Sequence, residues 1–190
     1  MFGTVAIPIR AKPTSTRWAR AMMASLDQPA LARLTAVAAA LPRQEQAEFV
    51  QSAVNRVIGR SPSANDCADD GYWAAASETL ARGVGDCIDI ALAKMEALRL
   101  LGIPQSDLYL TTGYFGAGAL TGAQVDRGRE SAALLVRLDD TFWLMTEQSD
   151  RIIEAGRLAD SSVRFAPVVT YGVGVTWVHG RLVQAAMLGQ

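Results

Sequence analysis

The sequence predicts a single α+β domain, and two observations support this fold class. Apolar residues recur at helical spacing through much of the first hundred residues, whereas from about residue 108 they alternate with a period of two. Helices that precede a run of short alternating segments favour an α+β domain built on an antiparallel sheet. A chain of 190 residues is long enough to bury one core, so we expect one domain over residues 1–190.

Composition argues against several function classes. With a net charge of −1, the chain has no basic patch of the kind that binds nucleic acid. No apolar run reaches the roughly 18 residues that would indicate a membrane span. The single histidine rules out a metal cluster of cysteines and histidines. Two cysteines, Cys67 and Cys87, do not make a disulfide framework, although they could pair with each other.

Prolines and capping residues divide the first sixty residues into segments. Pro8 and Pro13 oppose helix formation near the start, and a proline in the first turn follows the predicted cap Asp27. The sequence therefore predicts an extended segment over 1–13, a short helix capped by Ser15 or Thr16, a helix from Asp27 to about Ala40, and a helix from Leu41 to Gly59.

A buried helix with a cysteine in its first turn is predicted from residue 86 to 101. Asp86 is a suitable N-cap, and Gly102 with the proline that follows ends the helix. Its apolar face is formed by Ile88, Ala91, Leu92, Met95 and Leu98. Cys87 therefore lies where the helix dipole and free amide groups favour a thiolate. This position indicates a candidate nucleophile; the alternative is a packed, half-buried cysteine.

The second half of the chain is predicted to form the sheet. Short segments rich in β-branched and aromatic residues alternate with turn residues there. The predicted strands are 108–114, 132–138, 141–145, 163–171 and 173–178, with a hairpin turn at Asp139-Asp140 and a glycine-containing loop from Gly116 to about Arg129. We expect the cysteine-bearing helix to pack against the sheet that contains residues 132–145.

Around the cysteine, the order and spacing of residues resemble one known family. The matching runs are Gly85-Asp86-Cys87-x-Asp89, Ala91-x-Ala93-Lys94 and Leu98-Arg99-x-Leu101-Gly102-Ile103-Pro104. They are similar to the bacterial transglutaminase-like cysteine peptidases, the LapG-type periplasmic proteases that release large surface adhesins. The resemblance covers about four-fifths of the chain, from Met1 to near Ile152. It implies a papain/transglutaminase-like fold.

The catalytic pattern of that family is incomplete in this chain. The family uses Cys, His and Asp in that order, and Cys87 matches its nucleophile. Its His opens a strand that matches the run beginning at Ser131, and its Asp matches Thr146. Neither a hydroxyl at Ser131 nor one at Thr146 can act as a base near neutral pH or hold an imidazolium. The resemblance therefore implies a retained nucleophile position without its base and orienting acid.

The family's acidic calcium site is also altered. The family places a Glu directly after the Cys, whereas this chain has Ile88. Asp86 and Asp89 remain as possible ligands for weak calcium binding, although hard cations need several oxygen ligands. The alternative for both residues is local, with Asp86 as a cap and Asp89 favoured by the helix dipole in the first turn.

Three functional interpretations follow. The first is a catalytically inactive peptidase homologue that binds a peptide or protein segment, with Trp73 either lining the cleft or packing in the core. The second is an active thiol peptidase or acyltransferase that uses Cys87 with another base, for which His179 is the available imidazole. The third is an interaction module in which Cys87 has no chemical role. Glu147 and Asp150, near the lost Asp position, are interpreted as solvated loop acids.

Partner and location follow from the resemblance. It implies a peptide or protein partner, such as a surface adhesin of a biofilm, and a periplasmic location. The run from Met1 to Pro8 lacks the basic region and apolar core of a secretory signal. A trimmed chain, a misplaced start and a cytoplasmic protein all remain open.

Overall fold

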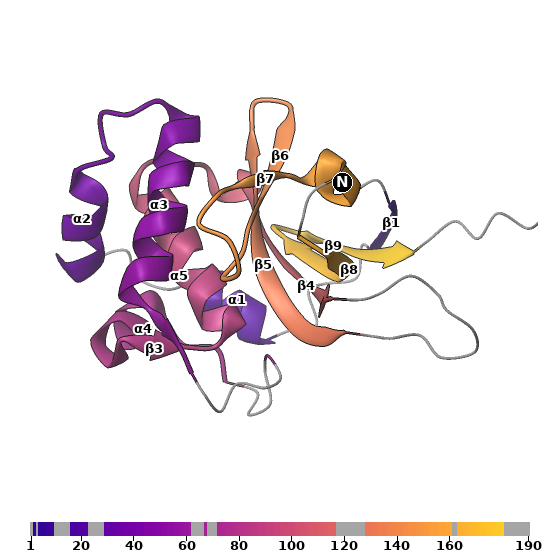
Figure 1. Cartoon of the computed structure of the whole chain (residues 1–190), viewed down its shortest axis with the longest axis horizontal. Coiled ribbons are helices and arrows are strands. Elements are labelled where there is room, and N and C mark those ends of the chain that lie inside the picture. Colours follow the sequence, from indigo (N-terminus) through magenta and orange to yellow (C-terminus); the bar gives the residue numbers. More distant parts are fainter. Residues whose placement is uncertain are drawn as a thin grey trace, which may run out of the picture.

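The helices gather on one side of a seven-stranded sheet in the computed structural model of this protein (Figure 1). The structure describes residues 2, 4–9, 16–22, 29–61, 67, 72–116, 128–160 and 163–180. Ser15, Asp27 and most of the glycine-containing loop lie outside these residues. In the described part of the chain, no helix combines the length and the apolar character needed to cross a membrane.

Among the described residues, five α-helices form the helical layer. They are α1 (Thr16–Met22), α2 (Pro29–Ala36), α3 (Arg43–Val57), α4 (Ala76–Arg82) and α5 (Cys87–Leu100), and two short 3₁₀ segments follow at Gln105–Asp107 and Ala155–Asp160. Figure 1 shows α5 between the other helices and strand β5. These bounds confirm the predicted order of helices followed by strands.

The main sheet is antiparallel throughout and has the order β1-β9-β8-β4-β5-β6-β7. Its strands are β1 (Val5–Ile9), β4 (Leu108–Phe115), β5 (Arg129–Leu138), β6 (Thr141–Met145), β7 (Ile153–Glu154), β8 (Phe165–Gly172) and β9 (Val175–Gly180). The predicted hairpin between β5 and β6 is confirmed, and Asp139 adopts the positive φ of 52° that its turn requires.

Helix α5 is the centre of the core, as predicted. The Asp86 side chain accepts a hydrogen bond from the Asp89 amide at 2.8 Å, which satisfies one unpaired donor of the first turn. Gly102 ends the helix region with a φ of 84°, a conformation that glycine adopts without strain. Every residue of α5 from Cys87 to Leu98 is buried, including the charged residues Asp89, Lys94 and Glu96. The helix packs against β5 and the rest of the helical layer.

The two faces of the sheet bury separate clusters. Alternate residues of β5 divide between them because successive side chains on a strand point to opposite faces. The α5-side cluster includes Leu110, Ala132, Leu134, Val136 and Met145. The far-side cluster includes Phe2, Phe115, Ala133, Leu135, Leu144 and Phe165, with Ala155 and Leu158 from the second 3₁₀ segment.

Three details differ from the sequence prediction. Helix α2 ends at Ala36 and not near Ala40, and residues 37–40 form turns. The sequence places Phe49, Val50, Ala53, Val54 and Val57 on one side of α3, but the buried face also takes in the polar residues Gln46 and Gln51, and Val57 is 46% exposed. A small parallel pair, β2 (Gly59–Arg60) with β3 (Val84–Gly85), was not predicted, because two residues give no periodic signal.

Candidate functional site

Cys87 is joined to Cys67 by a disulfide in this structure. Cys87 is the first residue of α5 and is buried, and its Cα lies 5.7 Å from that of Cys67. This spacing is within the usual range for a disulfide. The sequence left open whether the two cysteines pair, and the structure pairs them. In this form the sulfur of Cys87 is neither a thiol nor a thiolate, so it cannot act as a nucleophile.

Ser131, which the resemblance predicts at the family's His position, lies near the start of β5 and close to the disulfide. Cys67 Sγ is 3.4 Å from the carbonyl oxygen of Glu130, the residue before Ser131. Ser131 is buried and opposite Gly113 in the sheet, and its hydroxyl donates to Glu147 Oε1 at 3.3 Å. The structure thus brings Ser131 and the Cys67–Cys87 disulfide together at the start of β5.

Thr146, which the resemblance predicts at the family's Asp position, follows the last residue of β6 and is buried. Its hydroxyl accepts a hydrogen bond from the Gln148 amide at 3.1 Å, which orders a tight turn. Its carbonyl oxygen accepts from three side chains: Lys94 Nζ at 2.9 Å, Gln51 Nε2 at 2.7 Å and Asn55 Nδ2 at 3.2 Å. Thr146 therefore connects the end of β6 to helices α3 and α5 through its backbone carbonyl.

The polar anchor at this turn was missed at the sequence level. Gln51 and Asn55 also donate to the Ser149 carbonyl, the latter at 3.0 Å, so α3 holds both ends of the 146–149 turn. Gln51 and Asn55 are four residues apart and therefore lie on one helix face, and this spacing is the feature of the sequence that indicates a shared polar partner. The partner carbonyls are more than ninety residues away, and no local pattern in the sequence identifies them.

Lys94 is completely buried in α5, with 0% exposure. Burial lowers the pKa of its ammonium group from 10.5 to about 7, and the carboxylates of Glu147 and Asp150 oppose part of this shift. Lys94 belongs to the run that resembles the family, but the resemblance implies no role for it. A lone lysine within an apolar helix is a recognisable signal for a buried polar partner.

Glu147 is a buried ion-pair partner, which corrects its interpretation as a solvated loop acid. Its side chain is 5% exposed and pairs with Arg129 at 3.2 Å. Oε1 also accepts from Ser131 and from Gln148 Nε2, the latter at 3.4 Å. Its second oxygen, Oε2, is buried without a hydrogen-bond partner among the described residues. Asp150 is exposed, as predicted, and accepts from Asn55 at 3.3 Å.

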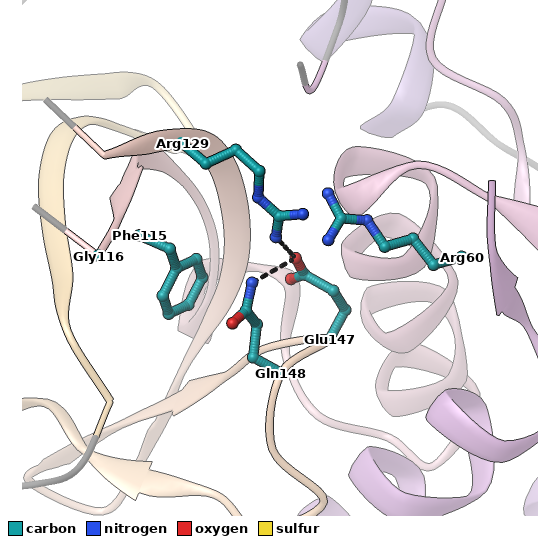
Figure 2. A pocket seen from close by; sticks show the side chains of 6 residues that line it. All are labelled: Arg60, Phe115, Gly116, Arg129, Glu147 and Gln148. Atoms are coloured by element: carbon teal, nitrogen blue, oxygen red, sulfur yellow. Dashed lines mark hydrogen bonds and ion pairs between the residues drawn. The ribbon is translucent and has the colours of Figure 1, made fainter. Parts of the chain in front are cut away.

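A pocket of about 410 Å³ opens beside this carboxylate. It is lined by Arg60, Phe115, Gly116, Arg129, Glu147 and Gln148. Figure 2 shows the guanidinium groups of Arg60 and Arg129 directed toward Glu147 from opposite sides, with the Phe115 ring forming another wall. The pocket lies next to the Ser131 and Thr146 positions because Glu147 contacts the first and follows the second in the chain.

Asp86 and Asp89 serve local structure. Asp86 caps α5, while Asp89 Oδ1 accepts from the Ala74 amide at 2.9 Å and Oδ2 pairs with Arg82 at 3.0 Å. Both oxygens of Asp89 thus face N–H donors, which a cation would have to displace. No group of three His, Cys, Asp or Glu residues suited to a metal ion occurs within the described ranges. These residues do not fit the acidic calcium site that the resemblance implied.

His179 lies on the far face of the sheet from Cys87. Its ring hydrogen-bonds with Thr4 through Nδ1 at 2.9 Å and with Thr170 through Nε2 at 2.8 Å, so both nitrogens have partners. It also contacts the ring of Phe2, which belongs to the far-side cluster, whereas Cys87 belongs to the α5-side cluster. Burial and the nearby N-terminus lower its pKa. His179 is therefore not placed to serve Cys87 as a base, which corrects that alternative.

Trp73 lies in the core and also lines a second pocket, of about 680 Å³, next to α1. Its ring meets that of Tyr171 edge-on at 6.1 Å, and its carbonyl accepts from Arg20 at 3.1 Å. The indole Nε1 is buried without a hydrogen-bond partner in the described part of the chain. The structure therefore places Trp73 in the core and at the wall of a pocket, and its role in binding a substrate stays a prediction. Asp89 connects this segment to α5 through the Ala74 amide.

Comparison with solved structures identifies the fold. Legionella pneumophila LapG is similar to this chain with a TM-score of 0.58 and 23% identity, over 78% of this chain and 76% of that one. Its calcium-bound form gives a TM-score of 0.61 and 21% identity, over 86% of this chain and 88% of that one. An EGTA-treated form gives a TM-score of 0.59 and 21% identity, over 83% of this chain and 81% of that one. The chain therefore has the LapG-type transglutaminase-like fold, which confirms the fold class predicted from the sequence.

Comparisons at the sequence level give no further assignment. No protein-family model matches the chain, and no curated protein matches it either. Sequence identity of 21–23% to the LapG structures shows a shared fold alone.

Proposed function

We propose that this protein is a transglutaminase-like cysteine peptidase homologue that does not hydrolyse peptides and acts by binding a peptide or protein segment. The observation that carries the proposal is the lack of an imidazole beside Cys87. The sequence has one histidine, and His179 faces the other side of the sheet with both ring nitrogens bonded. A cysteine peptidase needs a base to activate the thiol and an acid to protonate the leaving amine.

Two further observations support this proposal. Ser131 and Thr146 stand at the family's base and orienting positions, and their side chains are engaged with Glu147 and the Gln148 amide. Cys87 is in a disulfide with Cys67. The pockets near Glu147 and Trp73 supply the concave surfaces that a peptide ligand requires. The resemblance suggests a surface adhesin as the partner.

We expect no peptide hydrolysis above that of a Cys87→Ala control. Loss of a triad member lowers peptidase rates by roughly four orders of magnitude or more. The assay uses adhesin-derived and generic peptides, with and without calcium and with and without a dithiol reductant, which opens the disulfide. Turnover that requires Cys87 under any of these conditions would refute the proposal.

A gain-of-function variant tests whether the family's site was lost by substitution alone. The combination of Ser131→His, Thr146→Asp and Cys67→Ser restores the family pattern and frees the Cys87 thiol. Hydrolysis by this variant, absent in the same variant with Cys87→Ala, would support a peptidase origin for the cleft. A folded variant without activity would show that the cleft itself has diverged.

Calcium binding is expected to be weaker than micromolar. The similar structure of Legionella pneumophila LapG has a calcium-bound form. In this chain, however, the Asp89 carboxylate already accepts hydrogen bonds from Arg82 and from the Ala74 amide, and the Ile88 side chain has no oxygen to offer. Hard cations need six or more oxygen ligands. Titration calorimetry checks this, with Asp86→Asn and Asp89→Asn as paired variants. Micromolar binding that either variant abolished would contradict the expectation.

A periplasmic location is part of the proposal. The Cys67–Cys87 disulfide supports it, because such bonds form and persist in oxidising compartments and are rare in reducing ones.

A further inference from the structure

We propose that the pocket beside Trp73 binds a large apolar side chain of the partner segment, such as that of leucine. This rests on the proposed peptide-binding function and names the chemistry that this pocket selects. The pocket has a volume of about 680 Å³, which is within the range of pockets that bind small organic groups. Much of its wall consists of small apolar side chains next to the Trp73 indole, namely Ala19, Ala21, Ala74 and Ala75.

The charged side chains in the described lining of this pocket already have partners within the protein. Arg20 lies over the Tyr72 ring, with its Cζ 4.4 Å from the ring centroid, and donates to the Trp73 carbonyl at 3.1 Å. Glu78 accepts from the Tyr72 hydroxyl at 2.8 Å and from the Ala75 amide at 3.2 Å. A charged ligand would have to break these contacts, whereas an apolar group leaves them intact. The lining therefore favours an apolar ligand.

Tyr72 gives the pocket an exposed aromatic surface. Its side chain is 42% exposed, whereas Trp73 is 7% exposed. A leucine side chain in the pocket would cover part of the Tyr72 ring and of the alanine wall. The removal of this apolar surface from water favours binding, and it requires no polar group of the ligand.

The pocket adjoins the first turn of α5, where the disulfide lies. The Ala74 amide, in the pocket wall, donates to Asp89 Oδ1 at 2.9 Å, and Asp89 belongs to that first turn. Trp73 also packs in the same apolar cluster as Cys87. A peptide held here by an apolar side chain would therefore run close to Cys87, so this pocket and the proposed peptide-binding surface are continuous.

Two peptides whose central side chains have nearly the same size and shape test this inference on the full chain. They are acetyl-Ala-Ala-Leu-Ala-Ala-amide and its asparagine counterpart, titrated into nitrogen-labelled protein while the indole N–H signal of Trp73 is followed by NMR. Trp73→Phe identifies that signal. We expect the leucine peptide to shift it and to bind about tenfold more tightly than the asparagine peptide, a ratio that partial burial of a leucine side chain supplies.

Two variants change the pocket itself at exposed residues. Ala19→Leu adds a larger side chain to the wall formed by α1, and Tyr72→Ala removes the exposed ring. Each should reduce the preference for the leucine peptide. Ala32→Leu makes the same change as the first variant at an exposed position of α2, outside the pocket lining, and should retain the full preference.

The outcomes separate this inference from the proposed function. Equal binding of the two peptides would overturn the apolar site and leave peptide binding in place, as would binding that shifted backbone amide signals elsewhere but not the Trp73 indole signal. A leucine preference that survived both Ala19→Leu and Tyr72→Ala would also overturn it. If N-acetyl-leucinamide bound as tightly as the leucine peptide, the ligand would be a free apolar molecule and the inference would be wrong. No shift of any signal at millimolar peptide would contradict both the inference and the peptide-binding function.

Discussion

Replacing Lys94 by methionine is expected to stabilise the protein at pH 6, by about 1–4 kcal/mol, and to remove a rise in stability that the wild type shows at higher pH. Lys94 is fully buried and its pKa is lowered to about 7. At pH 6 the folded protein therefore holds a buried ammonium group, whose desolvation opposes folding.

Losing the hydrogen bond from Lys94 to the Thr146 carbonyl should destabilise the protein by less than removal of the buried ammonium group stabilises it. The Thr146 carbonyl keeps two other donors, Gln51 at 2.7 Å and Asn55 at 3.2 Å, so it is not left unpaired. Methionine matches the length of much of the lysine stem and fills the same apolar surroundings on α5. The 146–149 turn should therefore stay in place.

The pH dependence follows from proton linkage. Between about pH 7 and 10.5 the unfolded chain binds a proton on Lys94 that the folded chain has released. The free energy of unfolding therefore rises with pH across this window, by up to about 1.4 kcal/mol per pH unit. Below pH 7 both states carry the proton and this contribution is constant. The difference in the free energy of unfolding between the Lys94→Met variant and the wild type should thus become smaller as the pH rises.

Urea denaturation followed by tryptophan fluorescence at pH 6.0, 7.5 and 9.5 measures the effect. From pH 7.5 to 9.5 the wild type should gain about 2–3 kcal/mol relative to Lys94→Met. An Arg56→Met variant removes an exposed cation from α3, and its free energy of unfolding should change with pH as that of the wild type does. Parallel curves for the wild type and Lys94→Met would show that Lys94 titrates alike in the folded and unfolded chains.

Local signals made the fold predictable. Asp86 and Gly102 mark the ends of α5, and the residues between them have one apolar spacing, so the helix could be placed without knowing its neighbours. The β5–β6 hairpin was equally local, since the Asp139-Asp140 turn stands between two alternating segments.

The site was less predictable because its contacts are distant in the chain. Gln51 reaches the Thr146 carbonyl across 95 residues, and no local pattern records that pairing. Glu147 was expected to be a solvated loop acid, yet its side chain is 5% exposed and pairs with Arg129 at the start of β5, eighteen residues away in the chain. Ser131 and Thr146 were singled out by resemblance, while their interactions in this fold depend on tertiary structure.

Cys67→Ser is expected to lower the free energy of unfolding by about 3 kcal/mol without creating hydrolysis. The disulfide closes a loop with a sequence separation of 20, and removing such a cross-link restores chain entropy to the unfolded state. The wild type should show no free thiol when denatured without reductant, and the Cys67→Ser variant should show one, at Cys87. Alkylation followed by mass spectrometry counts them.

A double-mutant cycle isolates the cross-link from the side chains. Cys87→Ser removes the same bond and should cost a similar amount, and the double variant should be little less stable than either single one, because the bond is lost only once. Additive losses, or a Cys67→Ser protein as stable as the oxidised wild type, would show that the disulfide does not hold the fold.

The same variant separates the two obstacles to catalysis. In Cys67→Ser the Cys87 sulfur is a thiol at the N-terminus of α5, where the helix dipole favours its thiolate. If the disulfide alone suppressed activity, this variant would hydrolyse peptides. We expect it to remain inactive, because Ser131 and Thr146 still supply neither a base for the thiol nor an acid for the leaving amine, and His179 stays bonded on the far face. Peptide turnover by Cys67→Ser that His179→Ala abolished would instead establish a rewired base.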